Sequence, residues 1–201
     1  MDWLHNIALA AGLAWASGIR LYAVLFLAGA LGQFGYLALP PGLQVLQHPL
    51  VLGAAGVMAV GEFVADKVPA FDSLWDAAQT FIRVPAGAFL AAAALGTADP
   101  AWVAAAAILG GAIASGAHLT KAGMRAVANT SPEPFSNWTL SVGEDLLVPA
   151  GLIAAIKAPL VFLVLLGAFL IAAAWLLPKL WRAVRRVFGR LAAGAASRGS
   201  G

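Results

Sequence analysis

Between Trp3 and Gly61 the chain carries one charged side chain, that of Arg20. A soluble domain has about one charged residue in four, so an uncharged run of this length indicates segments that cross a membrane. Residues 158–177 form a second uncharged run, about as long as a helix that crosses a hydrocarbon core ~30 Å thick. With 62% hydrophobic and 10% charged residues, the sequence predicts an integral membrane protein.

The abundance of small residues, including 22 glycines, favours closely packed helices over a barrel. We therefore expect an all-α, polytopic helical bundle of about six crossings. These crossings are predicted at residues 4–37, 50–68, 84–98, 101–119, 138–156 and 158–177. The first segment would be about 50 Å long as one helix, which exceeds the thickness of a bilayer. Ser17 and Gly18 weaken a helix and Arg20 adds a charge, so we predict a break there, giving a hairpin or a re-entrant half-helix before a full span.

The two halves of the chain resemble each other. GLAWASGIRL, from residue 12, aligns with GGAIASGAHL, from residue 110, and GEFVADKVPA, from residue 61, aligns with GEDLLVPA, from residue 143. We therefore predict an internal duplication, with repeats at residues 1–98 and 99–178 and a basic tail at 179–201. Inverted repeats with interrupted helices are common in transporters, which bind substrate near the midplane. Inversion is a hypothesis here. It requires an odd number of crossings in each half, and that number depends on the form of the first segment.

The tail at residues 179–201 contains Lys and Arg but no acid. The positive-inside rule predicts that this tail is cytoplasmic, and its charge suits contact with anionic lipid better than with nucleic acid. The first residues lack the positive region of a secretory signal, so we expect the N-terminus to be retained as a membrane segment. The absence of cysteine excludes disulfides and thiolate metal sites.

Charges are concentrated in the stretch GEFVADKVPAFDSLWD, residues 61–76. Glu62 and Asp66 are four residues apart and would share one face of a helix. An acid inside a span is costly and usually faces a protein interior or a water cavity, so it is a functional hypothesis by default. Glu62 aligns with Glu144, and two carboxylates that share a dry site would hold a proton or ligate a cation. The alternative is that bases such as Arg83 neutralise them as structural ion pairs.

Asp72 and Asp76 form a second pair at the same spacing. Pro69 is expected to end the helix that begins near residue 50. The second pair would then lie on a short amphipathic stretch at the interface, before a span that opens near Arg83. A solvated interfacial loop explains this pair as well as a functional site does.

The Ser-Gly pairs are the other repeated feature. An unwound segment at Ser17 and Gly18 would expose helix ends that attract ions, and Arg20 beside it would attract an anion. The corresponding positions of the second half are Ser115, Gly116 and His118. A histidine there could titrate near neutral pH. The alternative is that the small residues only permit close helix packing.

The motifs of phosphate-binding loops, zinc hydrolases, serine hydrolases and dinucleotide-binding folds are missing from the sequence, so we expect no enzyme and no cofactor. The charged stretch resembles the signature of a bacterial membrane family known as domain of unknown function 4126. The matching positions are Glu62, Asp66, Lys67, Pro69, Asp72, Ser73, Trp75, Asp76, Arg83 and Gly87. The resemblance extends to about residue 177, and it implies a multi-pass protein of the bacterial inner membrane but no activity.

We predict a small transporter coupled to protons or cations, with carboxylates near the midplane at the repeat interface. The expected ion- or substrate-binding residues are Glu62, Asp66, Lys67, Asp72, Asp76, Arg83, Glu144 and Asp145. Ser17, Gly18, Arg20, Ser115, Gly116 and His118 are expected to line the path. The partners would be membrane lipids and a small ion or molecule, without nucleic acid, and a homo-oligomer is left open.

Two alternatives stand beside this prediction. The first is a translocator of phospholipid or lipid phosphate that uses Arg20, Lys67 and Arg83, and it predicts a lateral groove lined by Arg20 and Arg83. The second is a membrane scaffold that transports nothing, and it predicts acids bonded to neighbouring bases at the membrane surface. A transporter predicts instead a water-reachable cavity that joins the two carboxylate clusters near the midplane.

Overall fold

The computed structural model describes residues 3–68, 71–129 and 134–198, and every regular element within them is a helix. The elements are α1 (Trp3–Gln33), η1 (Pro41–Gln47), α2 (Pro49–Ala65), α3 (Phe71–Ala94), α4 (Pro100–Ala128), α5 (Pro134–Lys157) and α6 (Pro159–Arg198). The prediction of an all-α, polytopic bundle is confirmed. Pro69, which we expected to end a helix, lies outside the described residues, as does the end of the tail at 199–201.

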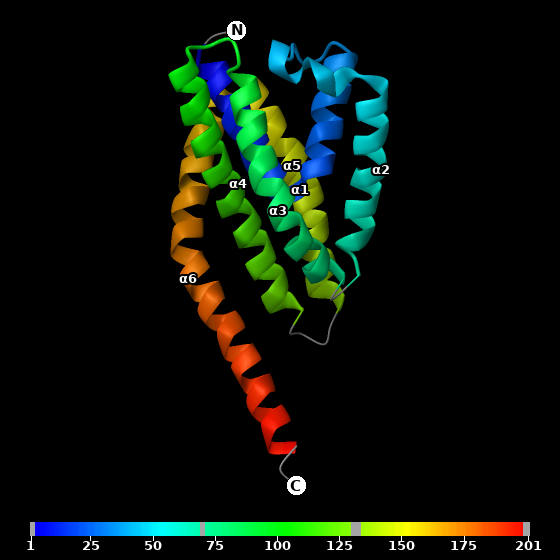
Figure 1. Ribbon diagram of the computed structural model, residues 1–201, viewed down its shortest axis with the longest axis vertical. Helices are drawn as coiled ribbons and strands as arrows, with labels where there is room; N and C mark the ends of the chain where they lie inside the picture. Colours follow the sequence, from blue (N-terminus) through cyan, green and yellow to red (C-terminus); the bar gives the residue numbers. More distant parts are fainter. Residues whose placement is uncertain (1–2, 69–70, 130–133, 199–201) are drawn as a thin grey trace.

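The first helix is broken at Arg20, whose backbone angles of φ −142° and ψ 77° are not helical. Its two arms, residues 3–19 and 21–33, form a V with both open ends on the same side of the bundle (Figure 1). His5 of the first arm therefore shares a small cavity with Leu37, which a straight helix would place roughly 48 Å away. The predicted break next to the first Ser-Gly pair is confirmed at Arg20.

Because both arms of α1 reach the same side, α1 does not cross the bundle. By length and composition alone, five helices including α1 could cross a membrane, or six when the bent pair η1 and α2 is counted as one span. Our expectation of about six crossings took the first segment as a full span, and the count of five candidate helices, or six with the bent pair, is consistent with it. The ends of the chain lie on opposite sides (Figure 1).

The helices that the duplication would pair run in opposite directions. In Figure 1, α2 descends where α5 ascends, and α3 ascends where α6 descends. This is the arrangement that an inverted repeat requires. The duplication itself remains a prediction, because opposite directions also arise in any bundle with short connections.

Two sequence predictions about helix boundaries do not hold. α4 runs without interruption through Ser115 and Gly116, so the second Ser-Gly pair makes no break. A single glycine costs a helix only about 1 kcal/mol, which packing easily offsets. α3 begins at Phe71, well before the span predicted from residue 84, so Asp72 and Asp76 lie on a crossing helix and not on an interfacial stretch.

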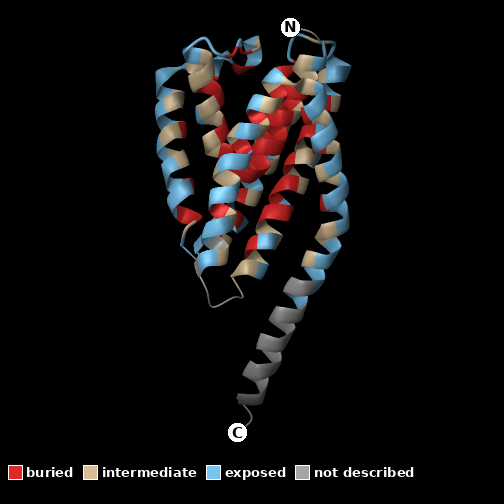
Figure 2. Ribbon diagram, turned by 180° about the vertical axis from the view of Figure 1, so that it is seen from behind, coloured by how far each residue is buried: buried red, intermediate tan, exposed pale blue. Residues whose placement is uncertain are grey.

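Polarity is distributed inside out relative to a soluble protein. Buried residues gather in the centre of the bundle along α1, as Figure 2 shows, and they include several charged side chains. Large apolar side chains on the outer faces are instead between 64% and 75% exposed; examples are Val57, Ile108, Leu146, Leu160 and Ile171. An apolar exterior around a charged interior is the arrangement expected of helices that face lipid.

Glycines allow the central helices to approach closely. A methyl group on Gly87 of α3 would collide with Ala114 of α4, and one on Gly110 of α4 would collide with Ala91 of α3. Gly18, just before the apex of α1, faces Ala114 in the same way. Because helix association in lipid depends on close packing, these contacts set the position of the apex between α3 and α4.

The Gly18→Ala variant is expected to destabilise the protein by about 1–3 kcal/mol, because its methyl group must displace the backbone carbonyl of Ala114. The matched control is Gly116→Ala, at the aligned position of the second half, where a methyl group would have only Leu170 nearby, at 3.9 Å. Thermal unfolding of the purified variants in detergent measures both effects. Equal melting temperatures would contradict this packing.

Candidate buried charge network

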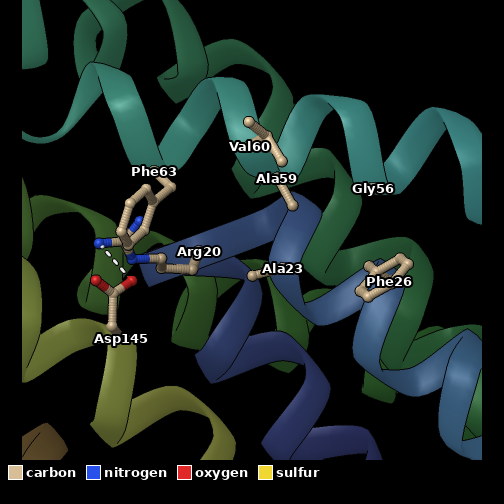
Figure 3. A pocket seen from close by; sticks show the side chains of 8 residues that line it. All are labelled: Arg20, Ala23, Phe26, Gly56, Ala59, Val60, Phe63 and Asp145. Atoms are coloured by element: carbon tan, nitrogen blue, oxygen red, sulfur yellow. Dashed lines mark ion pairs between the residues drawn. The ribbon is translucent and has the colours of Figure 1, made fainter.

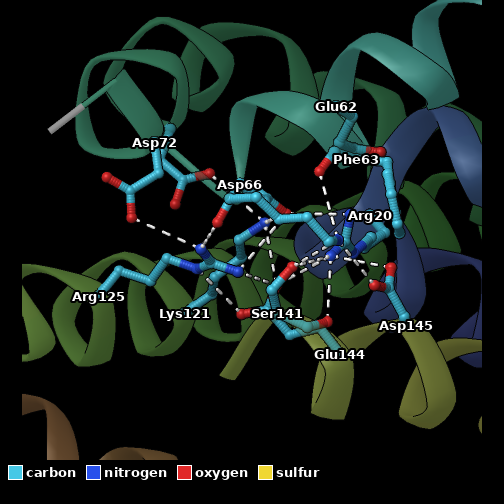
Figure 4. Close-up of polar contacts among 12 residues, drawn as sticks. Arg20, Glu62, Phe63, Asp66, Asp72, Lys121, Arg125, Ser141, Glu144 and Asp145 are labelled. Carbon is cyan, nitrogen blue, oxygen red and sulfur yellow. Dashed lines mark hydrogen bonds and ion pairs between the residues drawn. The ribbon is translucent and has the colours of Figure 1, made fainter. Parts of the chain in front are cut away.

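The charged side chains meet in one network around the apex of α1 (Figure 4). Its acids are Glu62, Asp66, Asp72, Asp76, Glu144 and Asp145, and its bases are Arg20, Lys67, Arg83, Lys121 and Arg125. All of them except Lys67, Glu144 and Asp145 are at most 4% exposed. Every residue that the sequence predicted to bind ion or substrate belongs to this network, which joins α1, α2, α3, α4 and α5.

Arg20 occupies the apex and joins α1 to the turn after α2 and to α5. Its Nη1 lies 3.1 Å from Asp66 Oδ2, and its Nη2 lies 2.9 Å from Asp145 Oδ1. Nη2 also donates to the carbonyl and hydroxyl oxygens of Ser141, at 3.2 and 3.1 Å. The break in α1 therefore directs the one charged side chain between Trp3 and Gly61 at partners that keep it out of lipid.

Lys121 of α4 completes the apex from the other side. Where α1 breaks, carbonyl groups of its first arm lose their helical partners, and the carbonyl of Ile19 accepts a hydrogen bond from Lys121 Nζ at 3.0 Å. The same ammonium lies 3.0 Å from Asp66, 3.3 Å from Glu144 and 3.6 Å from Asp76. One lysine thus caps the broken helix and bridges acids from three segments of the chain.

Arg125 lies one helical turn further along the same face of α4. Its guanidinium contacts Glu144 at 2.8 Å and donates to the main-chain carbonyl of Asp66 at 2.6 Å. It also lies 3.5 Å from Asp72, whose carboxylate accepts a second hydrogen bond from Asn129 at 2.8 Å. These contacts bury Asp72 completely, which is why it needs no interfacial water.

Arg83, near the middle of α3, holds the other end of the network. It contacts Glu62 at 2.6 Å and Asp76 at 2.8 Å. Its Nη1 lies 3.2 Å from Nδ1 of His118, and Nε2 of His118 lies 2.7 Å from the Thr80 hydroxyl. Because a guanidinium can only donate, Nδ1 must accept, so the geometry fits a neutral imidazole with its proton on Nε2. We expected His118 as a titrating group, and in this arrangement it serves as an acceptor for Arg83.

The other residues predicted to line a path lie at helix contacts. Ser17 is buried and donates to the carbonyl of Ala14 on its own helix, at 2.8 Å. Gly18 faces α4, as described above, while Gly116 is half-buried beside Leu170 of α6. Of the six predicted residues, Arg20 and His118 are the two with side-chain contacts to the described network.

Lys121 and Arg125 were not among the binding residues predicted from the sequence. They lie beyond the span predicted at 101–119, whereas α4 continues through Ala128. The available signal was the spacing of His118, Lys121 and Arg125, which places all three on one face of a helix. That face points inward, towards the acids.

The arrangement of acids and bases restricts what the site can hold. Among the described residues, no three His, Asp or Glu side chains are grouped as metal ligands. A metal cation bound by carboxylates would need several of them to converge, whereas here each acid contacts at least one base. The network is better suited to hydrogen ions, which bind to a single carboxylate.

Residues 7–179 match the family described as "Domain of unknown function (DUF4126)". The match covers most of the chain, so the chain belongs to this family. No curated protein and no solved structure matches the chain.

Replacing Lys121 by methionine is expected to cost about 3–5 kcal/mol of stability, because Asp66 and its neighbours would be left as uncompensated buried charges. The control is Lys67→Met, since Lys67 is 29% exposed and its ion pair with Asp145 should be worth no more than about 1 kcal/mol. Thermal unfolding in detergent gives both values. Adding Glu144→Gln to Lys121→Met should recover part of the loss, and strict additivity of these two changes would contradict their coupling.

Proposed function

We propose that the protein is a small membrane transporter coupled to protons, in which the buried charge network binds and releases the coupling proton. The observation that carries this proposal is the sharing of partners within the network. Asp66 contacts Arg20, Lys121 and Arg125, and Lys121 in turn contacts three acids. Because Asp66 and Lys121 each have further partners within reach, one of their pairs can separate without leaving either charge isolated in the bundle interior.

The charge balance of the network supports a proton as the coupled ion. Among the described residues, six carboxylates face five cationic side chains, with His118 neutral, so this part of the network carries one negative charge in excess when it is ionised. An uncompensated charge is costly in the hydrocarbon interior, and one bound proton removes it. Chains of acidic side chains and histidine are used as proton relays in membrane pumps and transporters.

Glu62 is the acid best placed to carry that proton. Its only ion-pair partner among the described residues is Arg83, which it shares with Asp76. Its second oxygen, Oε2, is buried without a hydrogen-bond partner in the described part of the chain. A protonated carboxyl can leave Arg83 to Asp76, which would loosen the contact between α2 and α3. Glu62 is therefore the proposed site of the excess negative charge, and its protonation would change the contact between α2 and α3.

The burial of the network favours transport over a scaffold. Arg83 lies midway along α3, and Glu144 and Asp145 lie midway along α5, whereas Asp72 and Arg125 lie in the first turn of α3 and the last turn of α4. A scaffold was expected to pair its charges at the membrane surface, whereas this network is buried between five helices. On the proposed orientation, the basic end of α6 is cytoplasmic in a bacterial inner membrane, and the network lies in the half of the bundle towards that side.

The test is proton movement into liposomes of bacterial lipid extract, driven by a potassium diffusion potential and followed with an internal pH dye. Wild-type protein is expected to acidify the interior of the liposomes. Glu62→Gln should reduce the rate at least about tenfold, since glutamine has no carboxylate that can bind and release the proton. Glutamine preserves the shape and can still accept from Arg83, so the variant should fold.

The matched control is Asp99→Asn, which alters an exposed acid that caps α4 outside the network. This variant should retain wild-type flux. The proposal fails if wild-type protein moves no protons above the rate of empty liposomes. It fails equally if Glu62→Gln and Asp99→Asn move them at the same rate.

A further inference from the structure

A lateral groove of about 530 Å³ lies between the second arm of α1, α2 and α5. Figure 3 shows Arg20 and Asp145 together at one end of the groove, with Phe26 at the other. Between them the wall is formed by side chains of α2 that include Val60 and by the bare backbone of Gly56. The groove is apolar along its length and charged at one end.

The charged end of the groove is lined by Arg20 and Asp145, and Lys67 lies beside it, in contact with Asp145 and Phe63. Asp145 is 26% exposed and Lys67 is 29% exposed, and their charged atoms are 3.4 Å apart. Lys67 also lies over the ring of Phe63, which lines the groove. Arg20 is buried behind them, and its Nε has no hydrogen-bond partner among the described residues. An acid and a base are therefore available side by side where the groove meets the network.

We propose that this groove binds a phospholipid whose headgroup carries both a phosphate and a primary ammonium, with an acyl chain along Phe26, Gly56 and Val60. The ammonium would pair with Asp145 and the phosphate with Lys67, so that neither charge of the protein faces hydrocarbon alone. Asp145 already pairs with Arg20 and Lys67, so a phosphate that draws Lys67 away leaves Asp145 Oδ2 free for an ammonium, which an anionic headgroup without an amine does not supply. A quaternary amine could not donate a hydrogen bond to Asp145.

The depth of the charged end links this site to the proposed transport. Asp145 lies about halfway along α5, roughly 17 Å from either end of that helix. Lys67, the partner proposed for the phosphate, follows the end of α2, so a headgroup there would bridge the end of one helix and the middle of another. The inference rests on the proposed function in this respect, since it names the substrate class of the transporter. The predicted lateral groove is lined by Arg20, whereas Arg83 lies inside the bundle against Glu62.

The inference is tested by native mass spectrometry of the purified protein with equal amounts of phosphatidylethanolamine, phosphatidylcholine and phosphatidylglycerol. Wild-type protein is expected to retain one phosphatidylethanolamine in preference to the other two. Gly56→Leu should lower that occupancy at least about fivefold, because its side chain enters the groove next to Phe26. Gly53→Leu is the matched control, since a side chain there has no neighbour within 4 Å.

Asp145→Asn supplies a second variant if Gly56→Leu does not fold, and it should abolish the preference for phosphatidylethanolamine over phosphatidylglycerol. Retention without headgroup preference, or equal occupancy in the two leucine variants, would overturn the inference. So would a dimer that Gly56→Leu dissociates, because the groove would then be a contact between copies of the chain. Proton flux without lipid binding would contradict this inference but not the proposed function. Lipid binding without proton flux would contradict the proposed function but not this inference.

Discussion

The rest of the structure depends on one requirement, that the guanidinium of Arg20 be neutralised inside the membrane. A cation in this position is tolerated only when it faces partners in the bundle interior. The acids that meet it, Asp66 and Asp145, come from the turn after α2 and from α5, and they in turn need the bases of α4. The V shape of α1, the depth of its apex and the convergence of five helices follow from this pairing.

The sequence was most informative where one residue dominates its surroundings. Arg20 stands alone in an apolar segment too long for one span, so the break could be predicted there. At the aligned position, His118 satisfies its hydrogen bonds with Thr80 and Arg83 while its helix stays straight. Equivalent small residues therefore give a break in one half and a continuous helix in the other. That difference arises from tertiary partners, which a local pattern does not contain.

The network could be predicted only in part. Its acids stand out in an apolar chain, whereas its bases do not. Glu62, Asp66 and their neighbours stood out against apolar sequence, whereas Lys121 and Arg125 lay beyond the span predicted at 101–119. Assigning them to the network required knowing that each base faces a buried acid from a distant segment. Asp72 was ambiguous for the same reason, since its partner Arg125 lies 53 residues away along the chain.

Buried ion pairs are weak evidence for stability, since apolar residues of similar size often pack as well or better. A bundle of this size could be held together by its glycine contacts alone, as the packing of α3 on α4 through Gly87 and Gly110 illustrates. A network in which Asp66, Lys121 and Arg125 each have several partners is therefore expensive for a purely structural role. Such a network suits ion pairs that must exchange partners, because Asp66, Lys121 and Arg125 would each keep a partner before and after the exchange. The accessible Lys67 and Asp145 then form the point where such an exchange can respond to a molecule arriving from the lipid.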